Sequence, residues 1–168
     1  MPEDLFWIEG LWPGRLAIVA RPRGGEWLAD DVSAWRRAGL DVIVSLLTLG
    51  ENAELDLSQE DDAANKQGLQ YFSFPIADRN VPASVVETQN LVQQLVGLLS
   101  AGKNIGLHCR QGIGRSALLA ASLLVHSGAG VDKAFQRIEK ARGCPVPDTA
   151  EQRHWVEQFK AAAMLAAP

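Results

Sequence analysis

The residues best suited to chemistry lie together in one stretch, which reads His-Cys-Arg-Gln-Gly-Ile-Gly-Arg-Ser over positions 108–116. Its two glycines allow a short loop to turn so tightly that successive backbone N–H groups point at one centre. If a helix begins where the loop ends, its unpaired N–H groups and positive dipole end face the same centre. The stretch therefore predicts a cradle for a tetrahedral oxyanion. The residues expected to bind the anion are Arg110, Gln111, Gly112, Ile113, Gly114 and Arg115.

Cys109 stands at the entrance of this cradle, where its sulfur could act as a nucleophile. A free thiol is only about 3% ionised at pH 7. Helix N-termini and cationic neighbours favour the thiolate, so we predict that the loop makes Cys109 reactive. Arg115 supplies a planar guanidinium that can bind two oxygens at once, which a lysine cannot do. Without these neighbours, the better interpretation of a lone cysteine such as Cys109 would be a small, buried hydrophobic residue.

Two other kinds of site fit this stretch poorly. His108 and Cys109 are neighbours at the end of an expected strand, so their side chains point to opposite faces, and the chain has no Cys-x-x-Cys pattern. A metal site is therefore not predicted. The end of the stretch resembles a nucleotide-binding P-loop, but the first glycine of that motif is replaced by Cys109 and its lysine by Arg115.

The elements that must position these residues alternate along the chain. Short apolar runs predict buried strands at 16–20, 42–47, 71–76 and 105–107. Helical periodicity covers 28–38, 84–100, 116–127, 131–141 and 149–163. This alternation predicts an α/β fold, a single domain over 1–168 with a central, mostly parallel sheet flanked by helices. The acidic segment 50–67 is expected to be a solvated surface excursion with one short helix.

The expected helix from Ser116 is apolar on nearly every side, which predicts that it is buried all round. It follows a short central strand directly. The connecting loop, from Cys109 to Arg115, therefore lies at the carboxyl end of the sheet, where open α/β folds bind ligands.

The composition of the chain excludes several classes of protein. The chain has 168 residues, 47% of them hydrophobic, and a net charge of −4, so it can form a core and has no overall positive field for nucleic acid. Its apolar runs are far shorter than the ~20 residues of a membrane span. Two cysteines are too few for a disulfide framework, and the first residues lack the pattern of a signal peptide. We therefore expect a cytoplasmic protein with no membrane span.

The pattern His-Cys-x5-Arg-Ser resembles the signature of the cysteine-dependent protein tyrosine phosphatase superfamily. The chain length and the Gly-x-Gly within the loop resemble its small, dual-specificity branch, and the likeness extends loosely over 13–159. The resemblance implies a phosphatase-type loop between a central strand and a buried helix. It also implies a phosphocysteine intermediate and no metal or cofactor.

In such enzymes a carboxylic acid protonates the leaving oxygen, because a thiolate alone cannot expel a poor leaving group. Asp78 is the best candidate, since it lies 31 residues before Cys109 on a loop between Pro75 and Pro82, a placement that resembles the family's. An ordinary turn aspartate is the alternative.

The resemblance implies supporting roles for several other residues. The hydroxyl of Ser116 would stabilise the departing sulfur, His108 would support the loop, and Gln152 would orient the hydrolytic water. For Gln152, an ordinary polar position in the first turn of a helix is an open alternative. Glu51 or Glu54 would hold the Arg115 guanidinium from behind. Cys144 would form a protective disulfide with Cys109 or simply pack.

The expected substrate is a phosphorylated protein or peptide, with phosphotyrosine first and phosphoserine or phosphothreonine next. A phosphatase of phosphoinositides or other non-protein phosphates is the enzymatic alternative. A catalytically silent phosphopeptide-binding module would lack Cys109, Arg115 or Asp78, and all three are present. Sulfur-transfer and arsenate-reducing enzymes do not explain the Asp78 loop.

Overall fold

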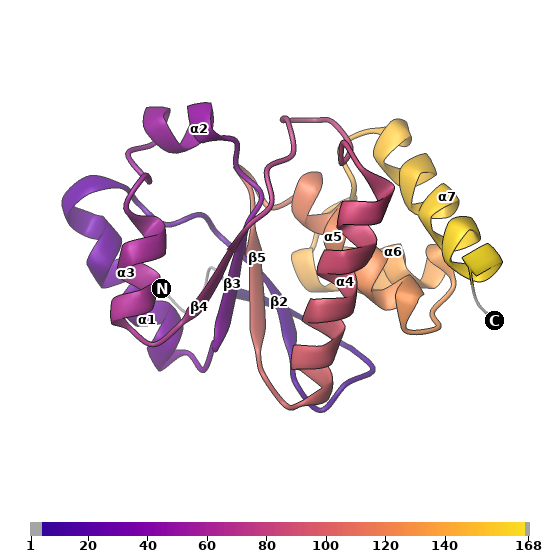
Figure 1. Ribbon diagram of the computed structural model, residues 1–168, viewed down its shortest axis with the longest axis horizontal. Coiled ribbons are helices and arrows are strands. Elements are labelled where there is room, and N and C mark those ends of the chain that lie inside the picture. The colour runs from indigo at the N-terminus through magenta and orange to yellow at the C-terminus, as the bar shows by residue number, and fades with distance from the viewer. Residues whose placement is uncertain (1–4, 167–168) are drawn as a thin grey trace.

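A five-stranded sheet forms the centre of the molecule, as the computed structural model, which describes residues 5–166, shows (Figure 1). Its order is β1-β2-β5-β3-β4, and every neighbouring pair is parallel except β1 and β2. The predicted mostly parallel sheet is confirmed. The strands are β1 (Leu5–Ile8), β2 (Leu16–Val19), β3 (Val42–Ser45), β4 (Gln70–Ser73) and β5 (Ile105–His108).

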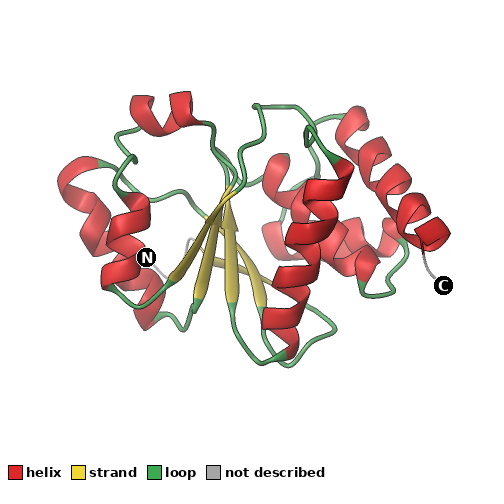
Figure 2. Ribbon diagram, viewed as in Figure 1, coloured by secondary structure: helices red, strands yellow, loops and turns green. Residues whose placement is uncertain are grey.

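Helices cover both faces of this sheet (Figure 2). On one face lie α1 (Leu28–Arg37), which follows a short 3-10 turn at Gly25–Trp27, and α3 (Glu60–Lys66). On the other face lie α4 (Val85–Ser100), α5 (Arg115–His126), α6 (Val131–Arg142) and α7 (Ala150–Ala166). The short helix α2 (Leu49–Glu54) lies beyond the edge of the sheet where β3 ends.

The helix after the loop is buried as predicted. Every residue of α5 except the last, His126, is buried, and the helix packs against α4, α6, α7 and the sheet. An element with apolar side chains all round has no face to give to water. Because β5 is the central strand and leads straight into the loop before α5, the loop is fixed at both ends by the core.

The structure differs from the sequence-based expectations in two places. The edge strand β1 was not predicted, because only its last residue, Ile8, is fully buried and its run is four residues long. The segment 50–67 contains parts of two helices rather than one, and it is not all solvated surface, since Glu51 and Glu60 are buried at 9% and 0% exposure. Thr48 and Glu51 form a capping box at the start of α2, a pattern that the sequence does carry.

The parallel strands bring three loops to one edge of the sheet (Figure 1). β3 leads into α2, β4 leads into the segment before α4, and β5 leads into the cysteine loop. Ligands of open parallel sheets bind at this carboxyl edge. Among residues 5–166, no helix combines the length and apolar character that crossing a membrane requires.

Candidate active site

The cysteine loop closes on its own first residue. The backbone N–H of Gly112 donates to Sγ of Cys109 across 3.2 Å, and Cys109 is only 3% exposed. Gly112 has a φ of 70°, a conformation that glycine adopts without strain. The loop ends at Gly114, and α5 begins at Arg115. The predicted loop between a central strand and a buried helix is therefore present.

Two arginines hold this loop from its outer side. Arg21 Nε donates to the carbonyl of Arg110 across 3.2 Å. Arg142, the last residue of α6, donates to the carbonyls of Gln111 and Gly112 at 3.2 and 2.9 Å. Three successive carbonyls are thus turned outward, an orientation that leaves the loop N–H groups free to face an anion. Sequence reasoning missed both arginines. Arg142 is in the last turn of a helix, where a basic residue usually serves only the helix dipole, and Arg21 lies in the segment after β2, 89 residues from the carbonyl that it binds.

Arg115 is buried at the base of the pocket, with 1% of its surface exposed. Glu51 binds its guanidinium with both carboxylate oxygens, at 2.6 and 2.9 Å. The Ile76 carbonyl accepts from Nη1 at 2.8 Å, and the Asp78 carboxylate accepts from Nη2 at 3.1 Å. Of the two glutamates considered for this contact, the structure selects Glu51.

Burial and the ion pair between Arg115 and Glu51 shift the pKa of each of these residues in opposite directions. Burial lowers the pKa of Arg115 and is the largest single effect, but the hydrogen bonds with Glu51 and the electrostatic interactions with Cys109, Glu51 and Asp78 together outweigh it and raise the pKa above its usual value. Burial likewise raises the pKa of Glu51, whereas hydrogen bonds from Arg115 and Thr48 bring it below its usual value. Both residues are therefore held in their charged forms.

Asp78 lies on the segment that follows β4, at the mouth of the site. Its side chain is 55% exposed and contacts Arg115. The start of this segment is fixed to its neighbour, because Ile76 N donates to the Leu46 carbonyl at 3.0 Å. The structure thus brings the predicted acid to the predicted nucleophile and guanidinium. A small pocket of about 90 Å³ is lined by Asp78, Arg79, Cys109, Gln111, Gly114, Arg115 and Asp148.

Ser116 and His108 lie on either side of the loop. The Ser116 hydroxyl is buried in the first turn of α5 and has no hydrogen-bond partner among the described residues. His108 faces the other side of the sheet, where its Nε2 lies 2.6 Å from Oε2 of Glu60 and its ring lies against Trp35. His108 therefore joins the strand below the nucleophile to α3 and does not line the pocket.

Gln152 is fully buried, and its amide is bonded within the protein. Its Oε1 accepts from the N–H groups of Asp148 and Thr149, at 3.1 and 3.2 Å. Its Nε2 donates to the Asn80 carbonyl at 3.0 Å. Gln152 thus ties the start of α7 to the Asp78 loop. The role of orienting water stays a prediction that these contacts do not support.

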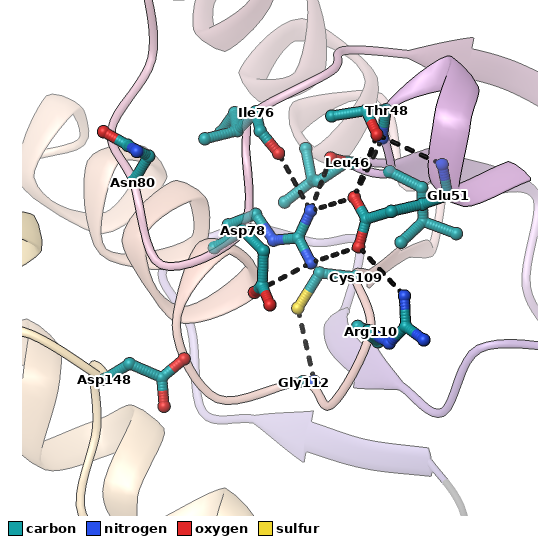
Figure 3. A network of polar contacts seen from close by, with 12 residues as sticks. Leu46, Thr48, Glu51, Ile76, Asp78, Asn80, Cys109, Arg110, Gly112 and Asp148 are labelled. Carbon is teal, nitrogen blue, oxygen red and sulfur yellow. Dashed lines mark hydrogen bonds and ion pairs between the residues drawn. The ribbon is translucent and has the colours of Figure 1, made fainter. Parts of the chain in front are cut away.

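Asp148 precedes α7, where an aspartate commonly caps the helix, and it was not among the predicted site residues. The cap is supplied by Thr149, whose hydroxyl accepts from the N–H of Gln152 at 3.1 Å. The Asp148 carboxylate instead lines the pocket and is directed toward the loop (Figure 3). It packs so closely that a Cβ at Gly114 would overlap Oδ2 of Asp148. A side chain at position 114 would therefore have to displace the Asp148 carboxylate.

Other side chains were considered as ligands or redox partners. Within residues 5–166, no group of three or more His, Cys, Asp or Glu side chains could hold a metal ion. Cys109 and Cys144 are both free thiols, and the half-buried Cys144 packs against the main hydrophobic core. A redox role for Cys144 stays a prediction.

The substitution Glu51→Gln tests the buried ion pair. We expect it to lower the free energy of unfolding by about 3 kcal/mol near neutral pH, because it leaves the Arg115 charge buried without its counter-charge. Chemical denaturation measures this difference. Glu54→Gln, on the same helix but with a side chain 67% exposed, is the matched control and should change the free energy by less than about 0.5 kcal/mol.

The same pair predicts a pH dependence of stability. The pKa of Glu51 is below its usual 4.5 in the folded protein, so its contribution is present above that value and is lost as the pH falls through the folded pKa. The difference in unfolding free energy between wild type and Glu51→Gln should therefore shrink below about pH 4.5. A difference that is constant with pH would contradict the assignment.

The substitution Arg142→Lys tests the outer support of the loop. A lysine cannot reach two carbonyls with a rigid fork, so we expect about tenfold weaker binding of vanadate, measured by calorimetry. Arg137→Lys, on the same helix α6, is the matched control, since the one hydrogen bond that Arg137 makes with the described residues is to the Glu9 carbonyl, away from the loop. Equal vanadate affinity in the two variants would show that Arg142 does not position the loop.

Comparisons with known proteins agree with this geometry. The family model described as "Dual specificity phosphatase, catalytic domain" matches residues 43–161. The curated Homo sapiens protein "Cyclin-dependent kinase inhibitor 3" is 26% identical over 132 residues, which are 77% of this chain and 62% of that protein. The chain thus spans less than two thirds of that relative.

Solved structures share the fold over nearly their whole length. A structure of kinase associated phosphatase, with its catalytic site cysteine replaced by serine, has a TM-score of 0.88 at 20% identity and covers 97% of each chain. A structure of PTPMT1 in complex with PI(5)P has a TM-score of 0.77 at 16% identity, and covers 96% of this chain and 99% of the other. At these identities the likeness shows the fold alone.

Proposed function

The chain belongs to the family of dual specificity phosphatase catalytic domains, and from this premise we propose that it hydrolyses phosphate monoesters on proteins through a phosphocysteine intermediate. The observation that carries the proposal is the convergence of Cys109, Arg115 and Asp78 on one small pocket. These side chains come from two segments separated by 31 residues of sequence. Each supplies a different requirement of phosphoryl transfer, namely a nucleophile, an anion clamp and an acid.

In the first step, the Cys109 thiolate attacks phosphorus in line with the leaving oxygen. The loop N–H groups and the Arg115 guanidinium hold the three equatorial oxygens, which bear the charge of the transition state. Asp78 protonates the leaving oxygen as the P–O bond breaks. The products are a phosphocysteine and the free alcohol or phenol.

The contacts of Arg115 indicate which of its nitrogens bind the phosphate. Nη1 is bonded to Glu51 and to the Ile76 carbonyl. Nε has no hydrogen-bond partner among the described residues, and Nη2 donates both to Glu51 and to the exposed carboxylate of Asp78. A phosphate that binds Nε and Nη2 through two oxygens would replace Asp78 on Nη2. The incoming substrate would thereby release the acid to reach the leaving oxygen.

In the second step, water attacks phosphorus, the S–P bond breaks, and one proton of the water passes to Asp78, which became a carboxylate in the first step. The Ser116 hydroxyl stabilises the departing thiolate by donating to it, and its lack of another partner supports this role. No bound metal takes part in either step. Because the mechanism needs a reduced Cys109, we expect the enzyme to act in a reducing compartment such as the cytoplasm.

The charges around the pocket favour a single phosphate on a protein. Two carboxylates, Asp78 and Asp148, stand beside Arg79 at the rim. Arg110 lies 3.8 and 3.4 Å from carboxylate oxygens of Glu51 and Glu54, which offset its charge. A multiply phosphorylated headgroup would require several uncompensated cations. The likeness to PTPMT1, solved with PI(5)P, keeps a phosphoinositide as the alternative substrate.

The substitution Cys109→Ser tests the nucleophile. We expect hydrolysis of p-nitrophenyl phosphate to be abolished while vanadate or phosphate still binds, because the loop amides and Arg115 remain. Activity assays, paired with calorimetry of oxyanion binding, measure both effects. The wild-type activity should persist in EDTA. Substantial turnover by Cys109→Ser would overturn the phosphocysteine mechanism.

A panel of substrates tests the proposed substrate class. We expect kcat/KM to be highest for phosphotyrosine peptides, lower for phosphoserine and phosphothreonine peptides, and lowest for phosphoinositides, because the rim carries carboxylates as well as arginines. All substrates are compared at one pH and ionic strength. If a phosphoinositide had the highest kcat/KM, the proposed protein substrate would be wrong and the phosphoinositide alternative would be supported.

A further inference from the structure

We infer that Gln152 is a positioning residue of the first step, where its buried amide holds the backbone turn that carries Asp78. The inference rests on the proposed phosphatase function and gives Gln152 a role other than the water-orienting one that the sequence suggested. Gln152 acts through Asp78 and does not touch the substrate.

Asp78 lies midway between two backbone anchors, at Ile76 and at Asn80 (Figure 3). On the side of β4, the Ile76 carbonyl accepts from Arg115 Nη1 at 2.8 Å. On the other side, the Asn80 carbonyl accepts from Gln152 Nε2 at 3.0 Å. Among the hydrogen bonds of the described residues, the bond from Gln152 is the one that fixes the turn on this far side. Without it, the turn would be anchored at one end.

The direct contact between Asp78 and Arg115 does not hold the acid during the reaction, because the incoming phosphate replaces it on Nη2. As the S–P bond forms and the P–O bond breaks, the proton of the Asp78 carboxyl passes to the leaving oxygen. This transfer requires a hydrogen bond of about 2.6–3.2 Å, and a displacement of about 1 Å can cost 10²-fold in rate. The backbone beside Asp78 therefore needs anchors that the substrate leaves in place.

The turn that carries Asp78 is strained. The N–H of Asn80 donates to the Ala77 carbonyl at 3.0 Å, and Arg79, the third residue of this turn, has a φ of 60°. Turns with a positive φ at the third residue favour glycine or asparagine there, because other side chains crowd the backbone. Such a conformation persists only where the surrounding structure fixes it. The bond from Gln152 to Asn80, the residue that follows Arg79, supplies this restraint.

The Gln152 amide is itself fixed and is fully buried. Its Oε1 accepts from the N–H groups of Asp148 and Thr149, which directs Nε2 at Asn80. An amide oxygen has two lone pairs, so these two N–H groups leave none with which to orient a water molecule. Gln152 lies near the start of α7, a helix that packs against α5. The anchor at Asn80 therefore rests on the core of the protein.

The dependence of kcat/KM on the leaving group tests the inference. Methionine is similar in length to glutamine but cannot donate to Asn80. We expect Gln152→Met to lower kcat/KM about tenfold more for phenyl phosphate, which has a poor leaving group, than for 2,4-dinitrophenyl phosphate, whose leaving group needs no proton. The two substrates form the same phosphocysteine, so the difference reports proton delivery in the first step. A merely structural role would lower both values equally.

Thr149→Ala is the matched control. It removes the hydroxyl that accepts from the N–H of Gln152 and so weakens the start of α7, but it leaves the bond to Asn80 in place. We expect a lower melting temperature and a wild-type ratio of kcat/KM for the two substrates.

Two combined variants test whether Gln152 acts through the turn. Asp78→Asn with Gln152→Met should lose no more activity on phenyl phosphate than Asp78→Asn alone, since both substitutions remove the same proton transfer. Arg79→Gly should restore part of the loss in Gln152→Met, because glycine adopts a positive φ without strain. If Gln152→Met does not fold, Gln152→Glu takes its place, since a carboxylate accepts from both N–H groups but has no donor for Asn80.

The outcomes separate the inference from the function on which it rests. Equal losses on the two aryl phosphates would overturn the inference, and so would losses that multiply in the variant with Asp78→Asn. A Gln152 variant that Arg79→Gly does not improve would overturn the restraint of the turn. All three results leave the phosphatase intact. A wild-type protein that forms no phosphocysteine from 2,4-dinitrophenyl phosphate would instead overturn the proposed function.

Discussion

The site depends on one buried ion pair, between Arg115 at the start of α5 and Glu51 on α2. A buried guanidinium is costly unless its donors are satisfied, and here Glu51, the Ile76 carbonyl and Asp78 all accept from it. These partners follow β3 and β4, while Arg115 follows β5. The pair therefore fixes three loops at the carboxyl edge of the sheet to one another. The same contacts that keep Arg115 charged also select which of its nitrogens face the pocket.

The cysteine loop shows how an acidic protein can bind an anion. The chain has a net charge of −4, but the loop concentrates backbone N–H groups, a helix N-terminus and one guanidinium within a small volume. The loop N–H groups keep pointing at the anion only when the carbonyl groups of the same peptides are held in place. Arg21 and Arg142 fix it by binding three carbonyls of the loop. Local geometry, rather than total charge, thus decides what the site attracts.

Most of the fold could be predicted from the sequence, because the buried strands and α5 are continuous apolar runs whose environment is set by their own residues. The nucleophile, the guanidinium and the oxyanion loop also lie within nine consecutive positions. The misses depend on contacts between distant segments. Glu60 is buried because it meets His108, 48 residues away, and Arg142 acts on carbonyls 30 and 31 residues away. Asp148 was not predicted as a site residue, because an aspartate before a helix usually serves as its cap, whereas here the neighbouring Thr149 supplies the cap. A single sequence does not show which of its distant residues come into contact in the folded protein.

The two carboxylates at the pocket pose an electrostatic problem, since each opposes the binding of a phosphate dianion. The structure reduces this cost in two ways. Asp78 lies on Arg115, so part of its charge is neutralised until the substrate arrives. Asp148 lies against the backbone of Gly114, at the N-terminus of α5, where the helix dipole favours negative charge. The two carboxylates are thus stabilised by different parts of the same anion site. Each can therefore stay near the reacting phosphorus, and Arg79 at the rim adds a second positive charge beside them.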